Sequence, residues 1–266
     1  MQIKVMSFNI LYDKPTANYT WQDRHQAVAA LISAYKPDII GTQECKPHQL
    51  FDLLQLLPEY QSIGGDRTGT GTDEYCAIFY RYNQFKCLST GDFYLSETPT
   101  IPGSITSSWG NPLPRMVTWA VLATALGNIT VFNTHLDYKS ARSRELSAKL
   151  ICDYITNIIN IEKSFVLLTG DFNANPQEIP RQIFNNFTIN NVKIIDALAK
   201  VQLNHQNTFH NFSGTAFDAV DTIYYDSRLQ LDEVKIENNQ WQGIWPSDHF
   251  PVVAYLTFMQ NLANNI

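Results

Sequence analysis

The sequence has few cysteines and no cysteine pair of the kind that binds zinc. Its 266 residues include four cysteines, and none of them belongs to a C-x-x-C motif. Scattered cysteines argue against a zinc site or a disulfide framework, and they are typical of free thiols in a reducing compartment. We therefore expect buried, unpaired thiols at Cys45, Cys76, Cys87 and Cys152.

The chain also lacks a long apolar run and a basic excess. No segment approaches the roughly 18 apolar residues that a membrane-spanning helix needs, and no basic and apolar leader precedes the first strand-like segment. The net charge of −6 is unlike that of proteins that coat nucleic acid. These absences predict a soluble, cytoplasmic protein without a membrane partner. They do not exclude a nuclease with a small basic groove, so nucleic acid stays open as a substrate that the charge does not indicate.

What the sequence does contain is an alternation of strand-like and helix-like segments. In its first part these patterns alternate at residues 3–11, 20–35, 38–44 and 47–57. Thr20 and Asp23 have the spacing of a capping box at the start of the first helix. Pro47 is a residue favoured at the first position of the second helix.

The rest of the chain is rich in strands and contains one long helix. Strand patterns occupy residues 76–82, 85–97, 116–126, 128–137 and 164–172. A helix is predicted over 140–159, where apolar residues recur every four positions at Leu146, Leu150, Tyr154 and Ile158. A short helix near 178–186 and a last group of strands follow. No linker or repeat divides the chain, so we expect one α/β domain over residues 1–258 and a short polar tail at 259–266.

Polar residues follow or begin the apolar strands at six places. They are Asn9, Glu44, His135 with Asp137, Asp171 with Asn173, Asp221, and Asp248 with His249. Each one alone has a structural explanation as a turn residue, a helix cap or a core histidine. However, α/β sheets bind ligands at the carboxyl ends of their strands, and an antiparallel neighbour begins where its partner ends. Mixed sheets would therefore bring all six places to one edge.

Such a convergence would have a chemical consequence. Carboxylates crowded into one cleft raise one another's pKa values and lower stability. A divalent cation relieves this repulsion, because Mg²⁺ prefers carboxylate, water and phosphate oxygens. His249 is suited to act as a general base near neutral pH if a carboxylate fixes its tautomer, and Asp171 could supply or relay a proton. The set predicts metal-assisted hydrolysis of a phosphate ester.

The motifs around these residues resemble those of the endonuclease/exonuclease/phosphatase superfamily, which has a DNase I-like fold. In chain order they are SFNI, GTQE, NTHLD, TGDFNANP, VDTIYY and SDHFPV, spanning residues 7–252. The resemblance implies an α/β fold with four layers, in which two mixed β-sheets pack face to face and helices lie outside. The segments FYLSETP and WGNPLPRMVTWA are similar to a bacterial-type subgroup whose substrates are undefined.

The resemblance also implies the cofactor. Glu44 matches the position of the principal Mg²⁺ ligand, and Asn9 and Asp248 match positions close to the ion or its waters. Mn²⁺ is an expected substitute for Mg²⁺.

Catalytic roles follow from the same comparison of motifs. His249 is expected to activate the attacking water and Asp221 to orient His249. His135 and Asn173 are expected to hold phosphoryl oxygens, and Asp171 to handle proton transfer. The division of the base role between Asp171 and His249 stays open.

The predicted function is Mg²⁺-dependent hydrolysis of a phosphate ester, with a small or nucleotide-type phosphodiester favoured as substrate. Arg115 is a candidate for binding the substrate phosphate, and Arg67 and Glu74 are weaker candidates. The alternatives are a nuclease or deadenylase acting on DNA or RNA and a non-catalytic binding scaffold. A serine hydrolase that uses Ser247 is disfavoured because the chain has no G-x-S-x-G motif. The sequence does not indicate an oligomeric state.

Overall fold

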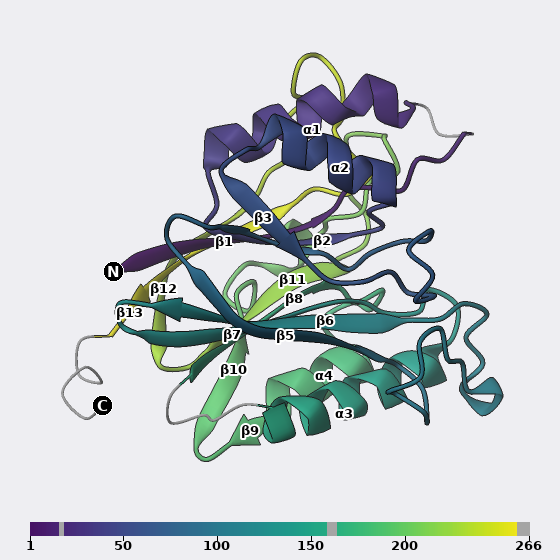
Figure 1. Ribbon diagram of the computed structural model, residues 1–266, viewed down its shortest axis with the longest axis vertical. Coiled ribbons are helices and arrows are strands. Elements are labelled where there is room, and N and C mark those ends of the chain that lie inside the picture. The colour runs from purple at the N-terminus through teal and green to yellow at the C-terminus, as the bar shows by residue number, and fades with distance from the viewer. Residues whose placement is uncertain (16–18, 159–163, 260–266) are drawn as a thin grey trace.

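The computed structural model of the protein describes residues 1–15, 19–158 and 164–259. Two β-sheets pack face to face, with helices on their outer sides (Figure 1). In spatial order, the six-stranded sheet contains β12 (Leu229–Ile236), β13 (Val252–Phe258), β1 (Gln2–Asn9), β2 (Ile39–Gln43), β4 (Ile78–Arg81) and β3 (Tyr60–Ile63). The seven-stranded sheet contains β5 (Lys86–Tyr94), β6 (Met116–Thr124), β7 (Gly127–His135), β8 (Ser164–Asp171), β11 (Asp221–Asp226), β10 (Val192–Asp196) and β9 (Thr188–Ile189).

Both sheets are mixed, as expected. Strands β1 and β2 run parallel, as do β7 and β8, whereas the other pairs of neighbours are antiparallel. Helices α1 (Trp21–Tyr35) and α2 (Pro47–Leu56) cover the six-stranded sheet, and α3 (Ala141–Ile158) and α4 (Ile179–Asn186) cover the other (Figure 1). The predicted four-layer sandwich is therefore confirmed.

Local signals in the sequence explain how two of the helices begin. The Thr20 hydroxyl accepts a hydrogen bond from the Asp23 amide, and the Asp23 carboxylate accepts one from the Thr20 amide, which completes the predicted capping box. Helix α2 begins at Pro47, as predicted. None of the described helices is long and apolar enough to cross a membrane.

The buried face of α3 differs from the one that the sequence indicated. The residues spaced by four, from Leu146 to Ile158, are only half-buried. The apolar residues that α3 buries most completely are instead Ala148, Ile151 and Ile155. A strict spacing of four residues advances about 40° around the helix at each step, so such a row turns away from the sheet.

The four cysteines are free, as expected. Three of them are buried as predicted, whereas Cys87 is only half-buried. Residues 260–266 of the predicted polar tail lie outside the described residues. The assignment of residues 1–258 to one domain remains a proposal. It is supported by the apolar interior that the two sheets share.

The interior between the sheets changes character along the strands. Side chains alternate along a strand, so every second residue faces the opposite sheet. On β1 and β8 these inward series are Ile3, Val5, Ser7, Asn9 and Phe165, Leu167, Thr169, Asp171. Each series begins apolar, passes a hydroxyl and ends in a residue of the predicted site. The same sheets therefore hold an apolar core at one end and a polar edge at the other.

A hydrogen-bonded layer separates these two ends. The side-chain amide of Asn133 donates to the Thr42 carbonyl oxygen at 2.8 Å, and its oxygen accepts bonds from Gln43 and Thr169 at 2.7 and 3.0 Å. Gly41 lies against this layer. A Cβ at Gly41 would lie 2.0 Å from Thr169 Oγ1, so only glycine permits this close approach of the sheets.

Candidate active site

The predicted site residues lie at one edge of the sandwich. Asn9, His135 and Asp171 end their strands, and Glu44 directly follows β2. In the seven-stranded sheet, Asp171 is paired with both His135 on β7 and Asp221 on β11.

A cavity of about 750 Å³ opens at this edge. Its lining includes Glu44, His135, Asp171, Asn173, Asp248, His249 and all three substrate-binding candidates, Arg67, Glu74 and Arg115. Asn9 and Asp221 lie behind this lining and are 1% exposed. The structure therefore brings all eleven predicted residues to one place.

His249 and Asp221 form a buried hydrogen-bonded pair. His249 Nδ1 lies 2.8 Å from Asp221 Oδ2, which directs Nε2 toward Asp171 Oδ2 at 3.9 Å. The Phe209 ring packs against the imidazole, with 4.9 Å between ring centroids. Burial alone would lower the pKa of His249, but the charges of Asp221, Asp171 and Asp248 outweigh it and raise the pKa well above its ordinary value.

Asp171 lies between Asn9 and His135 and contacts both through the same carboxylate oxygen. Its Oδ2 accepts a hydrogen bond from Asn9 Nδ2 at 2.9 Å and lies 3.4 Å from His135 Nε2. Burial, followed by the nearby charge of Asp221, raises the pKa of Asp171 to about 6. Burial, followed by the charge of Arg115, lowers the pKa of His135 well below its ordinary value. His135 is therefore a neutral imidazole at neutral pH.

Glu44 combines a strained backbone with a charged environment. Its φ of 61° lies in the left-handed region, which a residue with a long side chain seldom adopts and which is frequent at functional sites. Its Oε2 accepts a hydrogen bond from the Tyr12 amide at 3.2 Å. Burial, followed by the neighbouring charge of Asp248, raises the pKa of Glu44. A positive charge near Glu44 would offset both the loss of hydration on burial and the repulsion between Glu44 and Asp248.

The donor atoms at the edge fit a hard divalent cation. One ligand atom each from Glu44, His135 and Asp171 lies within 4.8 Å of the others. The carboxylate oxygens are the ligands that Mg²⁺ prefers. A second group of this kind, formed by Asp171, Asp221 and His249, includes the hydrogen-bonded histidine pair, so the position beside Glu44 is the better one for a metal.

Asn9, which was expected close to the metal ion or its waters, contacts the neighbouring carboxylates through its side-chain nitrogen. Its side-chain oxygen accepts a hydrogen bond from the Leu11 amide at 3.0 Å. Its nitrogen donates to Glu44 Oε1 at 3.1 Å and to Asp171 Oδ2 at 2.9 Å. In this orientation Asn9 positions two carboxylates and does not present its oxygen to a cation.

Asp137 does not join the carboxylate cluster, so that expectation was wrong. Its Oδ1 accepts hydrogen bonds from the Lys139 and Ser140 amides at 2.9 and 2.8 Å, just before α3 begins. Its Oδ2 lies 3.6 Å from Arg115 Nε. Asp137 therefore stabilises the turn that precedes α3 and forms an ion pair with Arg115 in the cavity wall.

A short loop that follows β3 contributes Arg67, Asp73 and Glu74 to the cavity wall. Arg67 Nη1 donates to Glu74 Oε2 at 2.7 Å, and Arg67 Nη2 lies 3.3 Å from Asp73 Oδ1. Burial, followed by the charge of Glu44, raises the pKa of Glu74 to about 7. Asp66 shapes this loop, because its carboxylate accepts hydrogen bonds from the amides of Thr68, Thr70, Thr72 and Asp73.

Two residues at the site have roles that the sequence interpretation missed. Ser247 is fully buried, and its hydroxyl donates to the Asn9 carbonyl oxygen at 2.7 Å. It therefore stabilises the backbone at Asn9 and is not placed to act as a nucleophile. Arg24, also fully buried, donates to the carbonyl oxygens of Ile10 and Pro246 at 2.7 and 2.8 Å. The spacing of Arg24 with Ala27, Val28 and Leu31 is that of a helix face, and this signal could have indicated a buried arginine.

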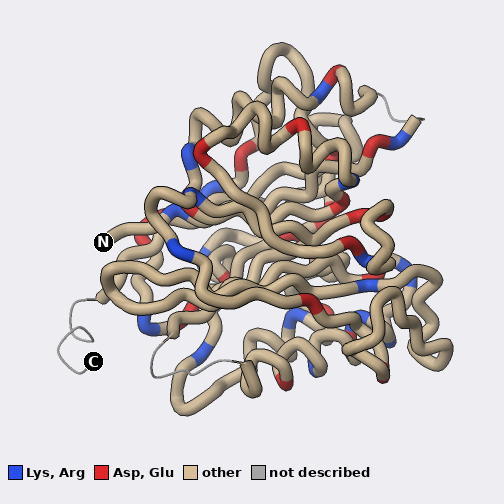
Figure 2. Tube along the Cα trace, in the orientation of Figure 1, with Lys and Arg blue, Asp and Glu red and all other residues tan. Residues whose placement is uncertain are grey.

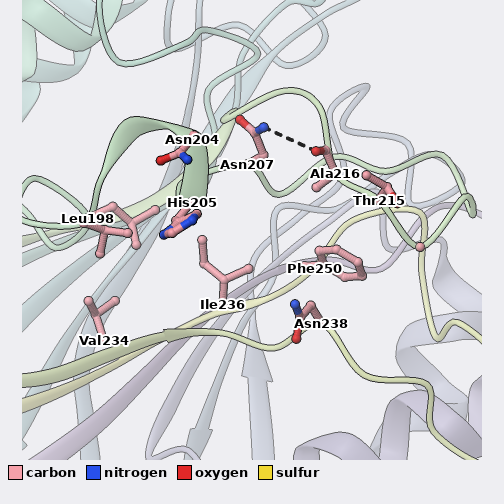
Figure 3. A pocket seen from close by; sticks show the side chains of 12 residues that line it. Leu198, Asn204, His205, Asn207, Thr215, Ala216, Val234, Ile236, Asn238 and Phe250 are labelled. Atoms are coloured by element: carbon pink, nitrogen blue, oxygen red, sulfur yellow. Dashed lines mark hydrogen bonds between the residues drawn. The ribbon is translucent and has the colours of Figure 1, made fainter.

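A second cavity of about 470 Å³ lies apart from these residues (Figure 3). Leu198, Val234 and Phe250 line it together with the side chains of Asn204 and Asn238. Neither Lys, Arg, Asp nor Glu is part of its lining. A phosphate ester would therefore meet neither Lys nor Arg there.

A sequence comparison identifies the family of this chain. The model of the Endonuclease/Exonuclease/phosphatase family matches residues 6–249. The chain belongs to this family. Its recognition from the six motifs is therefore confirmed.

Several relatives of the family are similar over nearly the whole chain. An endonuclease/exonuclease/phosphatase from Bacteroides vulgatus is 28% identical, with a TM-score of 0.88 and coverage of 97% of this chain and 100% of that one. A mannosyl-6-phosphatase from Bacteroides thetaiotaomicron is 29% identical, with a TM-score of 0.85 and coverage of 96% and 100%. Human nocturnin is 24% identical over 97% of this chain, which spans 66% of nocturnin's length.

Proposed function

We propose that the protein is a Mg²⁺-dependent hydrolase of small phosphate esters, in which water attacks phosphorus. The observation that carries this proposal is the hydrogen-bonded pair of His249 and Asp221, because His249 lines the same cavity as the carboxylates of Glu44, Asp171 and Asp248. Glu44 and Asp248, with Asp171 and His135 beside them, are the residues that would hold the ion. When bound, Mg²⁺ supplies positive charge for the phosphoryl oxygens of the transition state.

The protein's own residues divide the remaining work. Asp221 fixes the His249 tautomer, so that Nε2 accepts the proton of the attacking water. Asp171, with a pKa of about 6, in its protonated form donates the proton that the leaving oxygen takes up as its bond to phosphorus breaks. Asn173, neutral His135 and Arg115 donate hydrogen bonds to phosphoryl oxygens. The alternative assignment makes Asp171 the base. It is supported by the 3.9 Å between Asp171 Oδ2 and His249 Nε2, because a water beside one of these atoms is also close to the other.

The cavity favours a small substrate over a long nucleic acid. Four cationic and six carboxylate side chains line it, so a bound divalent ion would only neutralise the cavity, and no excess of positive charge would attract a polyanion. Lys and Arg are interspersed with Asp and Glu along the described chain (Figure 2). Similarity to a mannosyl-6-phosphatase supports a small phosphorylated substrate. Phosphodiesters remain in the proposal beside monoesters, because the single negative charge of a phosphodiester is compatible with the same cavity lining.

A substrate panel tests the proposal. Purified protein with Mg²⁺ should hydrolyse at least one small phosphomonoester or phosphodiester, and excess chelator should abolish turnover. Mn²⁺ should restore it. Glu44→Gln should require much more Mg²⁺ for half-maximal activity, whereas Glu145→Gln, on the exposed side of α3, is the matched control. Full turnover in excess chelator would contradict the metal requirement.

A further inference from the structure

The cavity wall formed by the loop that follows Asp66 holds a buried ion pair that has no role in the proposed chemistry at phosphorus. Arg67 and Glu74 are 9% and 8% exposed, and both belong to the lining of the cavity. Glu74 Oε2 accepts the bond from Arg67 at 2.7 Å. Among the described residues, no donor is hydrogen-bonded to the second oxygen, Glu74 Oε1. A carboxylate oxygen at the cavity is therefore available to a ligand.

The pair has little value as a stabilising interaction. Burying two charges removes them from water, and their attraction often fails to compensate for that loss. Arg67 Nε is buried without a hydrogen-bond partner, which further lowers the stability of the folded protein. A loop that only closed the sandwich would be at least as stable with apolar residues at these two positions. Substrate binding gives the pair a reason to be there.

The charge of the pair limits which ligand groups suit Glu74. Above its pKa of about 7, Glu74 is an ionised carboxylate that only accepts hydrogen bonds, so the ligand must present a donor. A cationic donor would also face Arg67, which already neutralises Glu74, and Arg115, whose charge acts on the same carboxylate. A second anionic group would be repelled by Asp73 and Glu74. The remaining donors are neutral, and hydroxyl groups are the simplest of them.

We infer that Glu74 recognises hydroxyl groups of the leaving group and that the substrate is a phosphorylated polyol of hexose size. Arg67 is a positioning residue that holds Glu74 in place. This inference rests on the proposed function, because it assumes that the phosphate group lies at the catalytic edge. A cavity of about 750 Å³ has room for a phosphohexose.

The test compares substrates that differ by one hydroxyl. Wild-type protein with Mg²⁺ is assayed on mannose 6-phosphate and glucose 6-phosphate, on their single-deoxy analogues, on phenyl phosphate and on guanosine 5′-monophosphate. We expect a hexose phosphate to have the highest kcat/KM. A hydrogen bond to a charged group contributes about 1.5–3 kcal/mol, so one deoxy analogue should lose about 10- to 100-fold.

Glu74→Gln then completes a double-mutant cycle. It should lower kcat/KM for the parent hexose phosphate by a similar factor and cause little further loss with the sensitive deoxy analogue. Glu145→Gln should retain the full difference between parent and analogue. Equal losses on hexose phosphate and phenyl phosphate would overturn the inference, because Glu74 would then act on the reacting centre. A preference for guanosine 5′-monophosphate would also overturn it.

The design separates two kinds of failure. If no ester in the panel is hydrolysed with Mg²⁺, the proposed function itself is wrong. If esters are hydrolysed but every deoxy analogue equals its parent, only the inference about hydroxyl recognition is wrong. The wild-type series gives this answer even if Glu74→Gln fails to fold, which a thermal melt would reveal.

Discussion

The two ends of the interior between the sheets are built on the same strands and differ in almost every physical respect. At one end Ile3, Ile129 and Phe165 are in the apolar core. At the other end, Asn9, His135 and Asp171 continue the same inward-facing rows. The apolar end contributes to folding by removing surface from water. The polar end keeps charges close together, which opposes folding and allows chemistry.

The largest expected effect is the loss of the proposed base. His249→Ala should lower kcat/KM by about 10²–10⁴-fold, which is the typical contribution of general acid–base catalysis. Activity is measured per folded molecule, with the folded fraction taken from a thermal melt. If His249 were only a structural residue of the turn, the variant would melt earlier and keep nearly normal turnover.

A substitution at the apolar end should have the opposite profile. Ile129 is fully buried in the core shared by the sheets. Ile129→Ala should lower the free energy of unfolding by about 2–5 kcal/mol, because it leaves a cavity and loses apolar contact. Its kcat/KM per folded molecule should stay normal in the same assay. A large loss of activity without a loss of stability would show that the two ends are not separable.

A substitution in the hydrogen-bonded layer around Asn133, between the two ends, should lower both the stability and the activity. In Gly41→Ala the new methyl group would approach Thr169 Oγ1 and the Asn133 amide oxygen, at 2.0 and 2.6 Å without relaxation. We expect a loss of about 1–3 kcal/mol in unfolding free energy from overpacking. The sheets must separate slightly beneath the catalytic edge, so kcat should fall as well. Denaturant unfolding and steady-state kinetics measure the two effects, and an unchanged kcat would limit the layer to a structural role.

The smallest expected change is a shift of the pH profile. A base must be neutral to accept a proton, so kcat/KM should rise as the pH increases through the raised pKa of His249. Asp221→Asn removes the nearest charge that favours the imidazolium, so the acidic limb should move to lower pH. The plateau should also drop, because the tautomer is less well fixed. An acidic limb that persists unchanged in His249→Ala would identify Asp171 as the base instead.

The sequence was sufficient for the parts of the fold that depend on neighbouring residues. Short apolar runs that end in Asn9 or Asp171 indicate strands whose carboxyl ends carry polar groups, and both strands end there. The capping box at Thr20 is also a local pattern. The convergence at one edge required the additional assumption of mixed sheets, which the parallel and antiparallel pairs confirm.

The sequence was not sufficient where a residue's partner is far along the chain. Arg24 binds the carbonyl oxygen of Pro246, which is 222 positions away. Asp137 appeared equivalent to Asp171, but its position just before α3 gives it two backbone amides as partners. The orientation of the Asn9 amide depends on Leu11, Glu44 and Asp171 together. Such choices depend on tertiary contacts, which local spacing does not encode.

The loop around Asp66 has a consequence for how this protein can diverge. Its path is set by one carboxylate that accepts hydrogen bonds from four of the loop's own amides, and the Tyr75 amide ties the end of the loop to the Cys45 carbonyl oxygen, next to Glu44. Evolution can therefore alter the side chains that this loop presents while the reacting groups stay in place. We expect relatives that retain an aspartate at this position to differ in substrate mainly through the residues that follow it. Exchanging residues 67–74 between two such enzymes is accordingly a direct route to new selectivity.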